Sequence, residues 1–138
     1  MSADFHSIPI VDISGLFAPD LAARRRVAEE IGRAAREVGF LYVTGHGVPE
    51  PLSAELRAAA ARFFAQPMAR KMATYIGRSA NHSGYVPEGE EVFASGKVDK
   101  KEAYDVNLDV PEAAGEAPML GATLWPELEG FRPAVAAY

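Results

Sequence analysis

A segment rich in glycine, serine, asparagine and proline runs from residue 77 to residue 96 and carries the side chains best suited to contact a ligand. It contains a cation, an amide, an imidazole and a phenol: Arg78, Asn81, His82 and Tyr85. Together such groups can position a polar or carboxylate-bearing substrate. Loops longer than about 12–15 residues usually carry function or remain mobile. We therefore predict substrate contacts from these four residues, and the alternative is a solvated loop with Tyr85 packed inside.

Other residues that could do chemistry are more simply explained as structural. His46 lies between two glycines, and a lone imidazole there could bind a metal or bond to the backbone of a turn. We favour the turn, because glycines suit a positive φ or a close backbone approach. Acidic side chains and lysines are mixed over residues 90–102, which is more typical of a solvated edge than of an acid–base pair. We predict no catalytic residue in this chain.

The composition is that of an ordinary soluble globular domain, with 49% hydrophobic and 24% charged residues in a chain of 138. A net charge of −5 gives no basic surface for nucleic acid. Cysteine is absent, so disulfides and thiolate chemistry are excluded. Residues 1–6 lack the features of a signal peptide, and no segment is long and apolar enough to span a bilayer. We expect a cytoplasmic protein that binds neither nucleic acid nor membrane.

The first elements alternate between strand and helix. Residues 8–13 are β-rich with Pro9 at an edge position, and residues 40–44 form an apolar run that predicts a buried strand. Between them, Val27, Ile31, Ala35 and Val38 recur at helical spacing. Asp20 is a suitable N-cap for this helix, and a glycine follows its end. The pattern predicts an amphipathic helix over residues 20–38.

Further elements are predicted after residue 50. Helices are expected over residues 51–66 and 68–76, and a strand over residues 101–110 with Tyr104, Val106, Leu108 and Val110 on its apolar face. A last helix begins near residue 131 and has no cap signal at the end of the chain. Because so short a helix is marginal by itself, we expect a truncation at residue 138. These elements together predict an α+β fold with a sheet too small to be independent.

Several short motifs resemble, in order and spacing, the N-terminal half of the isopenicillin N synthase-like iron(II)/2-oxoglutarate-dependent oxygenases. The resemblance spans nearly the whole chain, and its specificity comes from the set rather than from any one motif. The motifs are Ile8-Pro9-Ile10-Val11-Asp12, Gly39-Phe40-Leu41-Tyr42-Val43, Gly45-His46-Gly47-Val48-Pro49, Phe63-Phe64, Gly84-Tyr85-Val86-Pro87, Gly89-Glu90-Glu91, Lys101-Glu102, Trp125-Pro126 and Phe131-Arg132.

The resemblance implies that residues 1–138 are a single partial domain, containing the helical layer and the first strands of a double-stranded β-helix, or jelly roll. Enzymes of this family hold iron through a His-x-Asp pair and a distant histidine, which leaves positions for 2-oxoglutarate and oxygen. The residues two places after the three histidines are Ile8, Val48 and Gly84, so this chain has no such pair. We predict no metal or cofactor ligand here and expect the iron-binding core after residue 138.

The resemblance also brings the 77–96 segment to the mouth of the barrel and makes Tyr104 a fifth candidate substrate contact, although its place on an apolar face favours the core. We expect the full protein to bind iron(II) and 2-oxoglutarate and to oxidise a small organic substrate, with the missing C-terminal catalytic half as partner and this chain alone non-catalytic. The alternatives are a short non-catalytic interaction module and one half of a split oxygenase.

Overall fold

The computed structural model describes residues 7–138, so His6 lies outside the described residues. Helices and short strands alternate along the chain, which agrees with the predicted mixture of α and β structure. Contacts divide the chain into two compact units, Met1–Pro49 and Glu50–Tyr138, where the sequence suggests one partial domain over residues 1–138. Each unit is described by itself.

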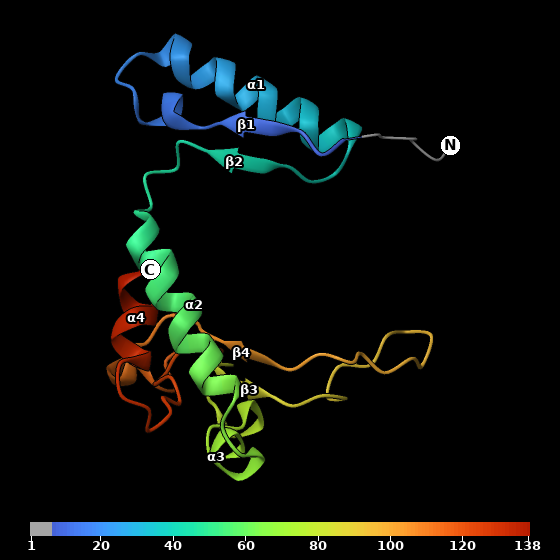
Figure 1. The fold of residues 1–138 in the computed structure, drawn as a ribbon, viewed down its shortest axis with the longest axis vertical. Coiled ribbons are helices and arrows are strands. Elements are labelled where there is room, and N and C mark those ends of the chain that lie inside the picture. Colours follow the sequence, from blue (N-terminus) through green and yellow to red (C-terminus); the bar gives the residue numbers. More distant parts are fainter. Residues whose placement is uncertain (1–6) are drawn as a thin grey trace. The chain divides into compact units, whose positions relative to one another are not determined.

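The first unit joins two parallel strands through a helix. Strand β1 (Ile10–Asp12) pairs in parallel with β2 (Tyr42–Thr44), and helix α1 (Leu21–Glu37) connects them after a 3-10 turn at Ser14–Phe17 (Figure 1). Asp20 caps α1 as predicted, because its carboxylate accepts hydrogen bonds from the backbone N–H groups of Ala22 and Ala23 at 3.0 and 3.2 Å. Local sequence signals therefore determine where α1 begins.

Burial in the first unit differs from the prediction in two places. In α1 the buried residues are Val27 and Ala34, and Ala35 of the predicted stripe is exposed. A strand does form within residues 40–44, but the prediction that it is buried is wrong, because all three residues of β2 are exposed. The physical reason is the size of the sheet: two strands with one covering helix leave one face and the sheet edges open.

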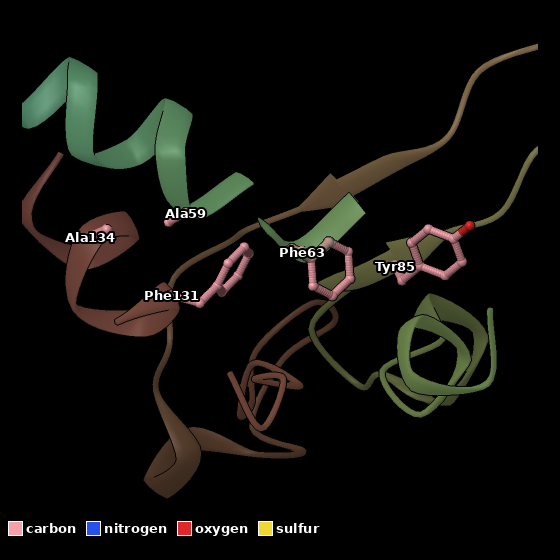
Figure 2. Packing of buried hydrophobic residues seen from close by; sticks show 5 residues of the cluster. All are labelled: Ala59, Phe63, Tyr85, Phe131 and Ala134. Atoms are coloured by element: carbon pink, nitrogen blue, oxygen red, sulfur yellow. The ribbon is translucent and has the colours of Figure 1, made fainter. Parts of the chain in front are cut away.

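The second unit is built around aromatic side chains between two helices and a hairpin. Helix α2 (Glu50–Phe64) packs against α4 (Phe131–Ala137), and strands β3 (Gly84–Val86) and β4 (Ala103–Asp105) pair antiparallel. Figure 2 shows the buried cluster of Ala59, Phe63, Tyr85, Phe131 and Ala134. The Phe63 ring lies at its centre, 5.9 Å from the Tyr85 ring and 5.1 Å from the Phe131 ring between centroids.

Regular structure in the second unit is shorter than predicted. Helix α3 spans Met68–Met72 and gives way to turns and a 3-10 helix at Ile76–Arg78, and a second 3-10 turn lies at Pro111–Ala113. The predicted strand over residues 101–110 is only β4, because side-chain hydrogen bonds, described below, replace the ladder after residue 105. Val106 and Leu108 of its predicted apolar face are exposed, at 43% and 70%. The predicted loop over residues 77–96 contains strand β3.

Candidate functional site

Asn81 is fully buried and joins three segments of the second unit. Its amide nitrogen donates to the carbonyl oxygens of Leu108 and Gly121 at 3.2 and 3.1 Å and to the hydroxyl of Thr123 at 3.2 Å. Its amide oxygen accepts a 2.7 Å hydrogen bond from the Ser79 hydroxyl. All polar atoms of this side chain are thus engaged inside the protein. The structure favours a structural role for Asn81 over the predicted contact with substrate.

The segment around His82 is held by hydrogen bonds from Asn107. The Asn107 amide nitrogen donates to the carbonyl oxygens of Asn81 and His82 at 2.9 and 3.0 Å, and the Asn107 backbone N–H donates to the buried Ser83 hydroxyl at 3.0 Å. His82 itself adopts a positive φ of 56°, which is uncommon for a residue other than glycine. The loop is therefore fixed by its buried neighbours.

Arg78 and His82 project from this fixed loop into solvent. Both side chains are exposed, and within residues 7–138 neither forms a side-chain hydrogen bond or an ion pair. A guanidinium and an imidazole on a backbone that cannot shift easily are well placed to meet a ligand with little loss of conformational entropy. Of the five predicted candidates, these two keep their polar groups available.

Tyr85 belongs to a partly buried polar cluster that the sequence did not indicate. Its hydroxyl donates to Oε2 of Glu102 at 2.6 Å, and the same oxygen accepts a 2.5 Å hydrogen bond from the Lys71 ammonium. The Lys71 nitrogen also lies 5.3 Å from the centroid of the Tyr85 ring. The Lys71 side chain is 8% exposed and that of Glu102 is 33% exposed. One carboxylate therefore holds α3, β3 and the start of β4 together.

The charges in this cluster stabilise one another. Hydrogen bonds from Lys71 and then from Tyr85 lower the pKa of Glu102, and the hydrogen bond to Glu102 raises the pKa of Lys71. Burial is the main cause that raises the pKa of the Tyr85 hydroxyl, with the Glu102 carboxylate adding to it. The pair is therefore ionised and the phenol neutral near neutral pH.

Tyr104 lies among the core aromatic rings, as its position on an apolar face indicated. Its ring is 4.9 Å from that of Phe63 and 5.0 Å from that of Phe131, and its hydroxyl donates to the carbonyl oxygen of Leu124. Burial strongly raises the pKa of this phenol. The hydroxyl is thus engaged inside the chain, although one edge of the residue lines an apolar groove of about 230 Å³.

That groove is bordered by helices α2 and α4 and by the residue that follows β4. We call it the α2–α4 groove, and its lining residues are Leu56, Ala60, Phe64, Tyr104, Val106, Phe131 and Val135. Every one of these side chains is largely or wholly apolar. An open apolar surface on a folded unit usually marks a contact with another part of a protein or with a partner.

Asp109 forms a second polar junction that sequence reasoning missed. Its carboxylate accepts hydrogen bonds from the backbone N–H of Thr123, the indole N–H of Trp125 and the Arg132 guanidinium, at 2.9, 2.9 and 3.0 Å. The hydrogen bond from Thr123 is the main cause that lowers the pKa of Asp109. The partners lie 14 to 23 residues away, so the short-range pattern contains no signal for this junction.

No group of three or more His, Asp or Glu side chains within residues 7–138 is arranged to hold a metal ion. His46 is exposed, and its Nδ1 accepts a 3.1 Å hydrogen bond from the Val48 backbone N–H, which is the turn contact predicted for it. The described residues therefore do not fit an iron site. None of the helices in this part of the chain has the length and apolar character needed to cross a bilayer.

Comparison with known proteins defines the class to which this fold belongs. A family described as "non-haem dioxygenase in morphine synthesis N-terminal" matches residues 8–128. The fold resembles that of a full-length Neurospora crassa protein solved in complex with alpha-KG and thymine, with a TM-score of 0.69 at 20% identity, over 94% of this chain and 41% of that one. The chain belongs to the non-haem dioxygenase N-terminal family.

Curated relatives are named as 2-oxoglutarate-dependent enzymes or hydroxylases. A homoarginine-6-hydroxylase from Oryza sativa subsp. japonica is 33% identical over 137 residues, covering 92% of this chain and 42% of the relative. One from Glycine max is 37% identical over 138 residues, covering 92% and 41%. A 2-oxoglutarate-dependent dioxygenase from Trichoderma harzianum is 33% identical over 144 residues, covering 100% and 44%. The chain thus spans about two fifths of the length of these relatives.

Proposed function

We propose that residues 1–138 are the N-terminal part of an iron(II)/2-oxoglutarate-dependent oxygenase that oxidises a small organic substrate in the cytoplasm. In this proposal a jelly roll outside these residues holds iron(II) and 2-oxoglutarate, and the 138-residue chain alone is non-catalytic. The observation that carries the proposal is the match of residues 8–128 to the N-terminal region of non-haem dioxygenases. The relatives, which are more than twice as long as the matched part, supply the precedent for a further catalytic portion.

The α2–α4 groove supports this assignment. The groove is open at the surface of the second unit, most of its lining side chains are only partly buried, and Val106 among them is 43% exposed. Burying an exposed apolar side chain contributes roughly 1.5–3 kcal/mol, and a partly exposed one contributes a fraction of that. A catalytic portion packed on the groove would recover part of that free energy.

Arg78 and His82 are the residues that we propose contact the substrate. Both are exposed, free of side-chain partners within residues 7–138, and carried by a backbone that Asn81 and Asn107 hold in place. A guanidinium and an imidazole would favour an anionic group such as a carboxylate. Because relatives are homoarginine-6-hydroxylases, homoarginine is the first substrate to assay.

A chimera tests the proposal. Residues 1–138 replace the matched N-terminal part of the rice homoarginine-6-hydroxylase, and succinate formation from 2-oxoglutarate is measured with iron(II) and homoarginine. We expect succinate from the chimera and none from the 138-residue chain alone. A well-folded chimera that forms no succinate, or a chain that forms it unaided, would contradict the proposal.

Two matched substitutions on α2 test the role of the groove in the same chimera. Leu56→Asp places a charge in the α2–α4 groove, and Ala61→Asp places the same charge on an exposed part of the same helix. We expect Leu56→Asp to abolish succinate formation and Ala61→Asp to preserve it. Circular dichroism of the two 138-residue variants shows whether each retains its helices. Equal activity of the two chimeras would exclude the groove as the packing surface.

A further inference from the structure

A second hollow of the second unit lies between α3 and the segment Trp125–Glu127. Its volume is about 240 Å³, and its lining includes Gln66, Arg70, Thr74, Trp125 and Pro126. It shares none of these residues with the α2–α4 groove and none with the five predicted substrate contacts. We call it the Trp125 pocket.

One wall of the Trp125 pocket is held rigidly. The indole N–H of Trp125 donates to the Asp109 carboxylate at 2.9 Å, and the Arg132 guanidinium lies 5.4 Å from the centroid of the indole ring. Asp109 also accepts hydrogen bonds from Thr123 and Arg132, so its own position is fixed. The pocket therefore presents an aromatic surface that does not need to be ordered by a ligand.

Two polar groups of the same pocket have no side-chain hydrogen bond to any residue that the structure describes. The amide of Gln66 is half-buried and forms no side-chain hydrogen bond within residues 7–138. Among the described residues, the Arg70 guanidinium has Glu127 alone as a counter-ion, at 3.8 Å, which is too long for a hydrogen bond. Both members of this ion pair are exposed, at 70% and 95%, so the pair is weak.

We propose that the Trp125 pocket binds a small aromatic carboxylate. A guanidinium presents two parallel N–H groups that match a carboxylate, a half-buried amide can add a further hydrogen bond, and the Trp125 and Pro126 surfaces suit a planar ring. The volume of about 240 Å³ is below the ~300 Å³ at which pockets for drug-sized ligands begin. A single ring bearing one carboxylate therefore fits better than a larger molecule.

The ligand would take the place of Glu127 as the partner of Arg70. Glu127 is almost fully exposed and can turn away from the pocket with little loss of packing. Its negative charge competes with the ligand for the same cation, so removing that charge should tighten binding. We therefore expect neutralising Arg70 to weaken ligand binding and neutralising Glu127 to strengthen it. The pocket is separate from the proposed oxygenase site, so the two proposals can fail independently.

Fluorescence titration tests the proposal, because Trp125 is the single tryptophan of the chain. Benzoate is added to the 138-residue protein and to three variants, Arg70→Gln, Glu127→Gln and the control Arg33→Gln, with excitation selective for tryptophan. Benzamide, which keeps the ring and lacks the charge, is the matched control ligand. Circular dichroism establishes that each variant keeps its helices.

We expect saturable quenching by benzoate with millimolar affinity and no saturable response to benzamide. Arg70→Gln should weaken benzoate binding by about tenfold, since it removes a hydrogen bond to a charged group. Glu127→Gln should strengthen binding, and Arg33→Gln, which changes an exposed arginine of α1 outside the pocket, should leave it unchanged. The proposal is overturned if benzoate causes no saturable change, or if Arg70→Gln binds benzoate as tightly as the parent protein does.

Discussion

The partly buried pair of Lys71 and Glu102 yields an asymmetric prediction about stability. Glu102→Gln keeps the shape of the side chain and removes its charge, which leaves the ammonium of Lys71, 8% exposed, without a counter-ion. Lys71→Met removes the buried cation and leaves a carboxylate that is 33% exposed and still accepts a hydrogen bond from Tyr85. We expect Glu102→Gln to be the more destabilising change, because an unpaired buried charge is the costlier result.

The expected magnitudes follow from burial. Breaking a fully buried pair costs about 3–5 kcal/mol, and the partial exposure of Glu102 reduces the expected cost of Glu102→Gln to about 2–3 kcal/mol. Lys71→Met should cost about 1 kcal/mol, since methionine fills most of the same space and the carboxylate can be hydrated. The double variant should be less destabilised than the sum of the two, because neither unpaired charge remains.

Urea unfolding followed by fluorescence measures these costs in the relevant part of the chain, because Trp125 lies in the second unit. Arg57 and Glu50 form a matched control pair on α2, with side chains 66% and 78% exposed. Arg57→Met and Glu50→Gln should each change the free energy of unfolding by less than about 1 kcal/mol. A larger loss for Lys71→Met than for Glu102→Gln, or fully additive losses in the double variant, would refute the reasoning.

Two other predictions concern the same unit. Asn81→Ala should reduce its free energy of unfolding by about 3 kcal/mol in the same urea assay, because buried acceptors lose their donor, whereas Arg78→Ala should change it by less than about 0.5 kcal/mol. Equal effects of these two changes would contradict the structural role of Asn81. The Lys71–Glu102 pair should also make the stability of the second unit depend on pH. The pKa of Glu102 is lowered below 4.5, so its contribution is present above pH 4.5 and is lost as pH falls through the folded-state pKa. The pKa of Lys71 is raised above 10.5, so its contribution is present below pH 10.5 and is lost as pH rises through the folded-state pKa. Urea midpoints measured from pH 3 to pH 8 should fall at the acid end in the parent protein and fall less in Glu102→Gln, and identical profiles would exclude this assignment.

Sequence resemblance predicted the family correctly, because several short motifs occur in one chain in the order and spacing that the family has. The family match over residues 8–128 confirms that assignment, and the relatives support the oxygenase class for the longer proteins. The jelly roll, the missing catalytic half and the cytoplasmic location stay predictions. The substrate contacts also stay predictions, although the structure leaves polar groups available only on Arg78 and His82 among the five candidates.

Local signals located the start of α1 but not the end of α3, since capping and periodicity act within a few residues and α3 ends at Met72 rather than near residue 76. Asp20 bonds to backbone groups two and three residues ahead, so the sequence alone locates the start of α1. Asn81, by contrast, bonds to groups 27, 40 and 42 residues away, and Lys71 meets Glu102 across 31 residues. Only the tertiary structure could decide that Asn81 is buried and His82 exposed, because burial depends on which distant segments the chain brings to each side chain.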